Sequence, residues 1–258
     1  MTRGAIVTGG GTGIGAAIAR RLAADGFAVA VTGRRREPLG VVAAETGALP
    51  VVADTGDPTD VQKAVEAAKS AFGRLDLLVC NAGIGLGGTV EEQSPEDWDA
   101  VLRTNVTGAF LACRAALPEL VQTKGSIVTI SSDSGLRAGP RSAAYCTAKA
   151  GLIMLTQCIA LDYGPRGVRA NCICPGWVRT PMADGSMDEL GELRGADREG
   201  AYELVSSRVP LRRPGSPDEI AAAVAWLASD GAGFTTGAVI AIDGGNSVVD
   251  ASSMEFVV

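Results

Sequence analysis

The sequence contains no histidine, and only 4% of its 258 residues are aromatic. The absence of histidine excludes Ser-His-Asp and Cys-His nucleophilic sites, HExxH zinc sites and a histidine general base. Proton transfer must therefore use Tyr, Lys, Asp, Glu or Cys. Cys172 and Cys174 lie close together but have no CxxC partner, so we expect no metal site.

The chain also lacks a long apolar run and an excess of positive charge. No stretch approaches the ~20 apolar residues of a membrane span, and a strand pattern starts near Ala5, which leaves no room for a signal peptide. The formal net charge is -6, whereas nucleic acids and anionic membrane surfaces bind basic faces. We therefore expect a cytoplasmic protein with buried thiols and with neither a nucleic-acid nor a membrane partner.

Apolar residues and glycine are abundant, at 47% and 34 residues respectively. Short apolar runs alternate with helix-length stretches, several of which open with a capping residue and proline, as at Asp57-Pro58, Ser94-Pro95 and Ser216-Pro217. Strands are predicted near residues 5–8, 28–32, 49–52, 76–80, 126–131, 168–173 and 239–242. This alternation predicts a doubly wound α/β (Rossmann) fold with a parallel sheet, in a single domain over residues 1–258.

Residues 182–208 interrupt the alternation between the sixth and seventh strands. They are rich in charge and glycine and carry no strand pattern. Ligands bind at the carboxyl ends of strands in such folds, and long irregular insertions are usually functional or disordered. We predict a lid at about 182–208 that is mobile without ligand and closes on binding. An ordinary pair of surface helices is the alternative.

A glycine-rich turn, Thr8-Gly9-Gly10-Gly11-Thr12-Gly13-Ile14-Gly15, joins the first strand to the first helix. Glycines let a backbone approach a pyrophosphate, whose charge is stabilised by the free N–H groups at the helix N-terminus. A plain turn is the alternative, but the position between a strand and an amphipathic helix favours a dinucleotide site. Residues 83–88 also match G-x-G-x-x-G, yet no helix pattern follows them, so we predict a loop there.

Tyr145 and Lys149 lie four residues apart on one predicted helix face, and Ser132 lies just after a strand. A Tyr-x-x-x-Lys pair alone is common. Combined with the glycine turn, these residues make the sequence resemble the short-chain dehydrogenase/reductase family, in the branch of similar chain length.

The resemblance covers essentially the whole chain. The motifs of the family are matched at Thr8, Gly9, Gly13 and Gly15, at Asn81-Ala82-Gly83, at Asn105, at Pro175-Gly176 and at Asp243-Gly244-Gly245. It implies hydride transfer between a nicotinamide cofactor and a small-molecule carbonyl or secondary alcohol. It further implies that Ser132 binds the substrate oxygen, that Tyr145 is the general acid/base, that Lys149 holds the ribose and that Asn105 holds a water.

The resemblance also implies which residues contact the cofactor. They lie in the glycine turn, at the ends of the second to fourth strands, on the catalytic helix and after the sixth strand: Gly9, Thr12, Gly13, Ile14, Gly15, Gly33, Arg34, Arg35, Asp54, Thr55, Asn81, Ala82, Gly83, Tyr145, Lys149, Pro175, Gly176, Val178 and Thr180. A free tyrosine, with a pKa of ~10, is a poor base near neutrality. We therefore expect the charges of Lys149 and of an oxidised nicotinamide to lower the pKa of Tyr145.

The end of the second strand indicates which cofactor is preferred. An Asp or Glu there would bind the ribose 2′-hydroxyl of NAD, but Gly33 occupies the position and Arg34-Arg35-Arg36 follow. With no carboxylate to repel a 2′-phosphate and three guanidinium groups to bind it, NADP(H) is favoured and NAD(H) is possible. A solvated basic helix start is the alternative.

Three functions fit these residues. An NADP-dependent carbonyl reductase or alcohol dehydrogenase is favoured. A 3-oxoacyl-thioester reductase is second, because Arg137 and Arg141 near the predicted mouth are suited to docking an acidic carrier protein, although the lid holds seven acidic and three basic residues. A non-catalytic NADP-sensing regulator is the third hypothesis. It is less favoured because such a regulator would not need Asn105, Ser132, Tyr145 and Lys149, all of which are present. The resemblance also implies a homo-oligomer, with a homotetramer favoured, and interfaces on helices around 98–117 and 144–163.

Overall fold

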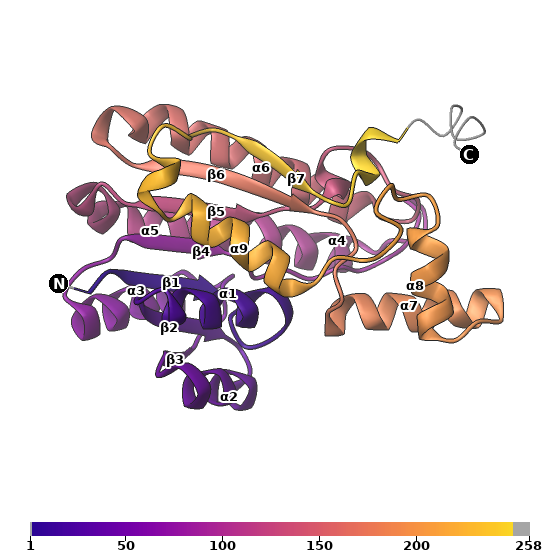
Figure 1. The fold of residues 1–258 in the computed structure, drawn as a ribbon, viewed down its shortest axis with the longest axis horizontal. Coiled ribbons are helices and arrows are strands. Elements are labelled where there is room, and N and C mark those ends of the chain that lie inside the picture. Colours follow the sequence, from indigo (N-terminus) through magenta and orange to yellow (C-terminus); the bar gives the residue numbers. More distant parts are fainter. Residues whose placement is uncertain (1, 250–258) are drawn as a thin grey trace.

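The computed structural model describes residues 2–249 and contains one parallel sheet (Figure 1). Its strand order is β3-β2-β1-β4-β5-β6-β7. The strands are β1 (Gly4–Thr8), β2 (Ala28–Gly33), β3 (Leu49–Val52), β4 (Leu77–Cys80), β5 (Ser126–Ile130), β6 (Arg169–Pro175) and β7 (Val239–Ile242). The order turns back between β1 and β4, and the carboxyl ends of strands at such a switch point form a ligand-binding crevice. The predicted doubly wound fold is confirmed, with strand ends within two residues of those expected.

Helices cover both faces of this sheet. They are α1 (Gly13–Ala24), α2 (Arg36–Thr46), α3 (Pro58–Phe72), α4 (Pro95–Leu102), α5 (Gly108–Thr123), α6 (Ala143–Tyr163), α7 (Pro181–Arg194), α8 (Arg198–Ser206) and α9 (Pro217–Leu227). One core lies between the sheet and α1, α2 and α9, and a second lies between the sheet and α3, α5 and α6. The central strands are buried on both faces because both cores pack against them.

The predicted cap-proline helix starts are confirmed. The Asp57 carboxylate accepts hydrogen bonds from Thr59 N at 2.8 Å and Asp60 N at 3.0 Å, and the Ser94 hydroxyl accepts one from Asp97 N at 3.0 Å. Ser216 forms a capping box with Glu219. Each cap accepts hydrogen bonds from N–H groups that have no partner at a helix start, so each helix begins directly after its capping residue.

Helix α6 begins a segment, Ala143–Arg166, that could cross a membrane by its length and composition alone. It is the one such helix among residues 2–249. The helix packs against β5 and β6 and buries Leu152 and Ile159 in the core beneath the sheet. Core packing therefore accounts for part of its apolar composition, since 44% of the apolar window is buried.

The six cysteines are all free thiols. Four are buried as expected, namely Cys80, Cys113, Cys172 and Cys174. Cys146 is only partly buried and Cys158 is exposed, so the prediction of buried thiols does not extend to these two. Both lie on α6, whose outer side the sheet does not cover.

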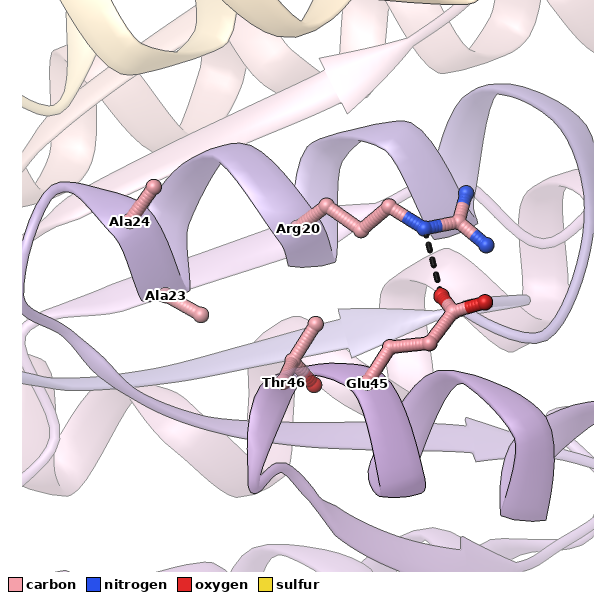
Figure 2. Close-up of a pocket in the computed structure, with 5 residues that line it drawn as sticks. All are labelled: Arg20, Ala23, Ala24, Glu45 and Thr46. Carbon is pink, nitrogen blue, oxygen red and sulfur yellow. Dashed lines mark hydrogen bonds and ion pairs between the residues drawn. The ribbon is translucent and has the colours of Figure 1, made fainter.

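A shallow surface groove lies where α1 meets α2 (Figure 2). Arg20 Nε donates to Glu45 Oε2 at 2.7 Å across it, and Ala23, Ala24 and Thr46 complete its lining. The two charged side chains are 49% and 45% exposed, so the pair contributes little stability. The groove is small beside the cavity at the carboxyl ends of the strands.

Candidate active site

A cavity of about 1590 Å³ opens at the carboxyl ends of the strands. It is lined by the residues predicted for cofactor binding and catalysis, with the exception of Gly15 and Asn105. Those two lie directly behind the lining, as described below. The structure therefore brings the predicted segments together in one cavity, and the roles of the individual residues remain predictions.

The glycine turn after β1 forms a cradle at one end of this cavity. Gly9 and Gly13 have φ values of +65° and +53°, which favour glycine. A Cβ atom at Gly15 would lie 2.2 Å from the carbonyl oxygen of Gly9, so a side chain there would displace the turn. Thr12 makes no side-chain cap bond to α1, which leaves the first N–H groups of the helix available to an anion. The turn thus fits the pyrophosphate of a dinucleotide.

Hydrogen bonds fasten this turn to the segment after β4. The Thr8 hydroxyl accepts from Asn81 N at 3.0 Å and from Ala82 N at 3.1 Å. The Asn81 side chain returns two bonds, from Nδ2 to Thr8 O at 3.0 Å and to Gly9 O at 3.2 Å. The two strand ends that flank the switch point are therefore held in one fixed arrangement.

Asn105 lies in a five-residue π-helical segment, Arg103–Thr107, between α4 and α5. Single π turns inside α-helices occur frequently at functional sites. Asn105 is 1% exposed, and its amide binds the backbone of Ile84 twice, accepting from N at 2.9 Å and donating to O at 2.8 Å. It shapes the loop over residues 81–93, which also contains the second glycine match, confirmed as a loop. The predicted water-holding role stays a prediction.

Ser132, Tyr145 and Lys149 converge at the other end of the cavity. Ser132 follows β5 and caps a short 3-10 turn by accepting from Ser134 N at 3.1 Å. Tyr145 and Lys149 extend from α6, and Lys149 Nζ lies 5.5 Å from the centre of the Tyr145 ring. Nζ donates to Ile130 O at 2.9 Å, and the Ser131 hydroxyl donates to Lys149 O at 2.8 Å. These bonds fix α6 against the end of β5.

The pKa of Tyr145 beside Lys149 differs from the value expected from the sequence. Desolvation in the cavity raises the pKa of Tyr145 to about 12; a hydrogen bond with Ser132 opposes this shift and the negative charge of Asp133 adds to it. Burial lowers the pKa of Lys149 to about 8, so Lys149 remains mostly protonated at pH 7. The predicted decrease in the pKa of Tyr145 is therefore absent from the protein alone. Lys149 directs its charge at the carbonyl oxygen of Ile130 instead.

Two guanidinium groups lie at the cavity end nearest β2. Arg34 and Arg35 follow Gly33, line the cavity and are exposed. None of the ion pairs formed within residues 2–249 involves either arginine. Asp54 is engaged elsewhere, because its carboxylate accepts from Gly56 N at 2.9 Å and pairs with Arg103 at 3.5 Å.

Residues 182–208 form a helix pair instead of the irregular segment expected. Ala183 and Met187 of α7 pack against Ala201 and Tyr202 of α8 in a small separate core, and both helices project beyond the sheet in Figure 1. A left-handed Gly195 ends α7, so this glycine turns the chain between two helices. The ion pair Arg198–Asp188 at 2.7 Å further joins α8 to α7, and Arg179, which precedes α7, pairs with Glu199 of α8 at 2.6 Å.

Thr180 connects this helix pair to the glycine turn. Its hydroxyl caps α7 by accepting from Ala183 N at 3.2 Å. A Cβ atom at Gly13 would lie 3.1 Å from the Thr180 Cγ2 methyl, so the start of α7 lies against the start of α1. Pro175, Gly176 and Val178, which precede Thr180 in the sequence, also line the cavity.

Two polar residues that the sequence did not single out, Asp133 and Asn246, extend the group formed by Ser132, Tyr145 and Lys149. The Ser132 hydroxyl donates to Asp133 Oδ1 at 3.1 Å, and Asn246 Nδ2 donates to Asp133 Oδ2 at 2.8 Å. Both residues line the cavity. Adjacency to Ser132 was the one sequence signal for Asp133, and no local pattern links it to Asn246, which lies 113 residues away.

Comparison with known proteins gives consistent matches over nearly the whole chain. The family model described as enoyl-(acyl carrier protein) reductase matches residues 9–247. Protein MoaE of Klebsiella aerogenes is 42% identical, covering 99% of this chain and 100% of its own. The meso-2,3-butanediol dehydrogenase of Serratia marcescens is 37% identical, and the match covers 95% of this chain and 94% of the dehydrogenase.

Two solved structures share the fold at similar identity. A levodione reductase is 35% identical with a TM-score of 0.92, covering 96% of this chain and 98% of its own. A single-substitution variant of an actinorhodin polyketide ketoreductase, solved with NADPH, is 32% identical with a TM-score of 0.92 and the same coverage.

Proposed function

Because the chain belongs to the short-chain dehydrogenase/reductase family, we propose that it is an NADP(H)-dependent carbonyl reductase or secondary-alcohol dehydrogenase with Tyr145 as its proton donor. The reaction class itself follows from the family: the protein is an oxidoreductase that transfers a hydride between a nicotinamide cofactor and a small carbonyl or alcohol substrate. The observation that carries the proposal is the convergence of Ser132, Tyr145 and Lys149 in a cavity whose other end is a glycine cradle.

Cofactor binding is assigned to the residues that fit each part of a dinucleotide. The N–H groups at the start of α1 bind the pyrophosphate, and Asp54-Thr55 flank the adenine. Lys149 holds the ribose next to the nicotinamide, and Thr180 lies within the segment that contacts its carboxamide. When bound, the nicotinamide supplies the hydride and, in its oxidised form, a positive charge.

The chain's own groups control the proton. Ser132 and Tyr145 bind the substrate oxygen, and during carbonyl reduction Tyr145 donates its phenolic proton to that oxygen. A pKa of about 12 keeps Tyr145 protonated at neutral pH, as a proton donor requires. The buried Lys149 ammonium then stabilises the tyrosinate until it is reprotonated. Alcohol oxidation needs the tyrosinate and therefore depends on additional positive charge in the cavity.

The preference for NADP(H) is supported by the end of β2. Arg34 and Arg35 are exposed, line the cavity and form no ion pair with the described acidic residues. A 2′-phosphate accepts charge-assisted hydrogen bonds from a guanidinium group. The related ketoreductase was solved with NADPH, which agrees with this assignment.

A 3-oxoacyl-thioester reductase is the second candidate, supported by the similarity of the chain to the 3-oxoacyl-[acyl-carrier-protein] reductase FabG of Thermotoga maritima, which is 35% identical over 93% of this chain and 96% of its own. The two arginines expected to dock a carrier protein both line the cavity but are engaged. Arg141 pairs with Glu92 at 2.8 Å, and the Arg137 guanidinium donates to Asn246 O. The geometry therefore favours a free small-molecule substrate.

A substrate panel distinguishes these candidates. We expect the protein to oxidise NADPH with one or more simple ketones, followed by absorbance, and to do so with a higher kcat/KM than with acetoacetyl-CoA. Turnover confined to the thioester would favour the second candidate. Tight NADPH binding with no turnover of any carbonyl compound would indicate a sensing role and contradict the proposal.

We also propose that α7 and α8 close over the cavity as one unit. Their shared core and ion pairs join them to each other, while Leu190 and Leu193 of α7 line the cavity. Hydrogen exchange over residues 181–206 should slow several-fold when NADPH and substrate are added, because closure excludes water. Amides of α3 serve as the control and should not change. Strong and equal protection of α7 and α8 in all states would instead mean a fixed wall.

A homo-oligomer, with a tetramer favoured, and a cytoplasmic location complete the proposal. Phe110 on α5 and Met154 and Leu161 on α6 are exposed apolar side chains on the helices expected at the interfaces. Exposed apolar groups on neighbouring elements are typical of subunit contacts.

A further inference from the structure

Asp133 places a carboxylate beside the catalytic serine, within the cavity that holds the substrate. Its Oδ1 accepts the Ser132 hydroxyl proton at 3.1 Å, and its Oδ2 accepts from Asn246 Nδ2 at 2.8 Å. The side chain is half-buried and lines the cavity. The proton-transfer chemistry described above does not use this carboxylate.

The position of Asp133 is fixed from both sides. Ser132 belongs to the turn that follows β5, and Asn246 belongs to the short turn Asn246–Val248 after β7. That second turn is itself held, because Asp243 Oδ1 accepts from Gly245 N at 3.0 Å and the Arg137 guanidinium donates to Asn246 O. A carboxylate held this firmly can discriminate between substrates by position.

The carboxylate has acceptor capacity that the protein does not fill. An ionised carboxylate offers about four lone-pair sites, and two are used by Ser132 and Asn246. None of the ion pairs within residues 2–249 includes Asp133. A charge partly removed from water without a cation is costly unless further donors approach it. A substrate entering the cavity is in a position to bring one.

We propose that Asp133 selects substrates that carry a hydrogen-bond donor, a hydroxyl or an ammonium group, on the carbon next to the reacting carbonyl. The inference rests on the proposed function, because it takes Ser132 as the group that binds the substrate oxygen. The single Ser132 hydroxyl proton then turns from Asp133 Oδ1 to that oxygen, which frees a further acceptor site on the carboxylate. A substrate oxygen bonded to Ser132 lies within about 6 Å of Asp133 Oδ1, given a hydrogen bond of about 2.8 Å. Within that limit, a donor bonded to Asp133 can reach about 3 Å from that oxygen, which is the spacing of groups on adjacent carbons.

The same carboxylate disfavours acidic substrates. An anionic group on the adjacent carbon, as in a 2-oxo acid, would lie next to the charge of Asp133, which forms no ion pair within residues 2–249, and like charges repel. Selection at this position therefore has an attractive and a repulsive component.

The test compares matched ketones with the full-length protein and NADPH. The first pair is 1-hydroxy-2-propanone and 1-methoxy-2-propanone, which have similar electronic effects on the carbonyl but differ in the donor. We expect kcat/KM to be about ten- to a hundredfold higher for the hydroxyl compound, as for one hydrogen bond to a charged group. 1-Amino-2-propanone distinguishes ammonium from hydroxyl as the preferred donor, and pyruvate tests the repulsion.

The Asp133→Asn variant separates recognition from structure. If Asp133 recognises the donor, the ratio of kcat/KM between the hydroxyl and methoxy compounds falls at least tenfold. The kcat/KM for the methoxy compound then changes less than that for the hydroxyl compound. Glu189→Gln removes a carboxylate from the α7 side of the same cavity and should leave the ratio unchanged. If Asp133 only held Ser132 in place, the variant would have an equally lowered kcat/KM for both substrates. The ratio would then be unchanged, and this result would overturn the inference.

The wild-type comparison keeps the inference testable even if the variant fails to fold. Similar kcat/KM values for the hydroxyl and methoxy compounds would overturn the selection by Asp133 and leave the proposed function intact. No NADPH oxidation with any ketone would overturn the proposed function, and this inference with it.

Discussion

Tyr145→Phe is expected to lower turnover by about 10²- to 10⁴-fold and to change the Kd for NADPH by no more than a few-fold. The substitution removes the phenolic proton and leaves the ring, which packs 5.5 Å from Lys149 Nζ. Turnover is measured by NADPH absorbance and the Kd by fluorescence titration. Tyr163→Phe is the matched control, because Tyr163 ends the same helix and is not among the residues that line the cavity.

The outcome for Tyr145→Phe discriminates between two roles for this side chain. A general acid is needed in every turnover, whereas a packing residue affects chiefly stability. Retention of more than a tenth of wild-type turnover, with chemistry shown to be rate-limiting, would rule out Tyr145 as the proton donor. A loss of NADPH binding as large as the loss of turnover would also argue for a structural role.

Arg34→Ala is expected to weaken NADPH binding about ten- to a hundredfold while changing the affinity for NADH by less than about threefold. The reason is that the contact proposed for this guanidinium group is with the 2′-phosphate, which NADH lacks. Gly33→Asp should shift preference toward NADH, since a carboxylate repels that phosphate and binds a ribose hydroxyl. A Cβ at Gly33 would meet only Leu39 Cδ2 at 3.7 Å, so the fold accommodates the substitution.

Arg36→Ala is the matched control for these cofactor variants. Arg36 belongs to the same basic run but starts α2 and does not line the cavity. Both affinities should stay at the wild-type value in this variant, as measured by titration. Equal losses for NADPH and NADH in Arg34→Ala would show instead that the arginines form a solvated face.

Local patterns predicted most of the fold because they report local physics. Continuous apolar runs identified the buried strands, and the cap-proline pairs such as Asp57-Pro58 identified helix starts. Thr180-Pro181 carries the same signature and opens α7, so the sequence contained the signal for a helix there. Charge and glycine in residues 182–208 obscured it, because a small helix pair buries few side chains and gives weak periodicity.

The chemistry of the site depended on contacts that sequence patterns do not contain. Ser132, Tyr145 and Lys149 could be named from spacing, but the direction of the Tyr145 pKa follows from desolvation and from the charge of Asp133. The bond between Asn246 and Asp133 likewise depends on the sheet order, in which β6 pairs with both β5 and β7. The pKa of Tyr145 and this hydrogen bond can therefore be obtained only from the tertiary structure.

Transfer of deuterium from NADPH labelled at the reactive C4 position to a ketone tests the central claim most directly. The account predicts that product alcohol carries one deuterium on the former carbonyl carbon, as detected by mass spectrometry and NMR. It also predicts that Tyr145→Phe forms less deuterated alcohol, in proportion to its lower turnover. NADPH that binds at the cavity yet delivers no deuterium to any carbonyl compound would contradict the assignment of this protein as a hydride-transfer enzyme.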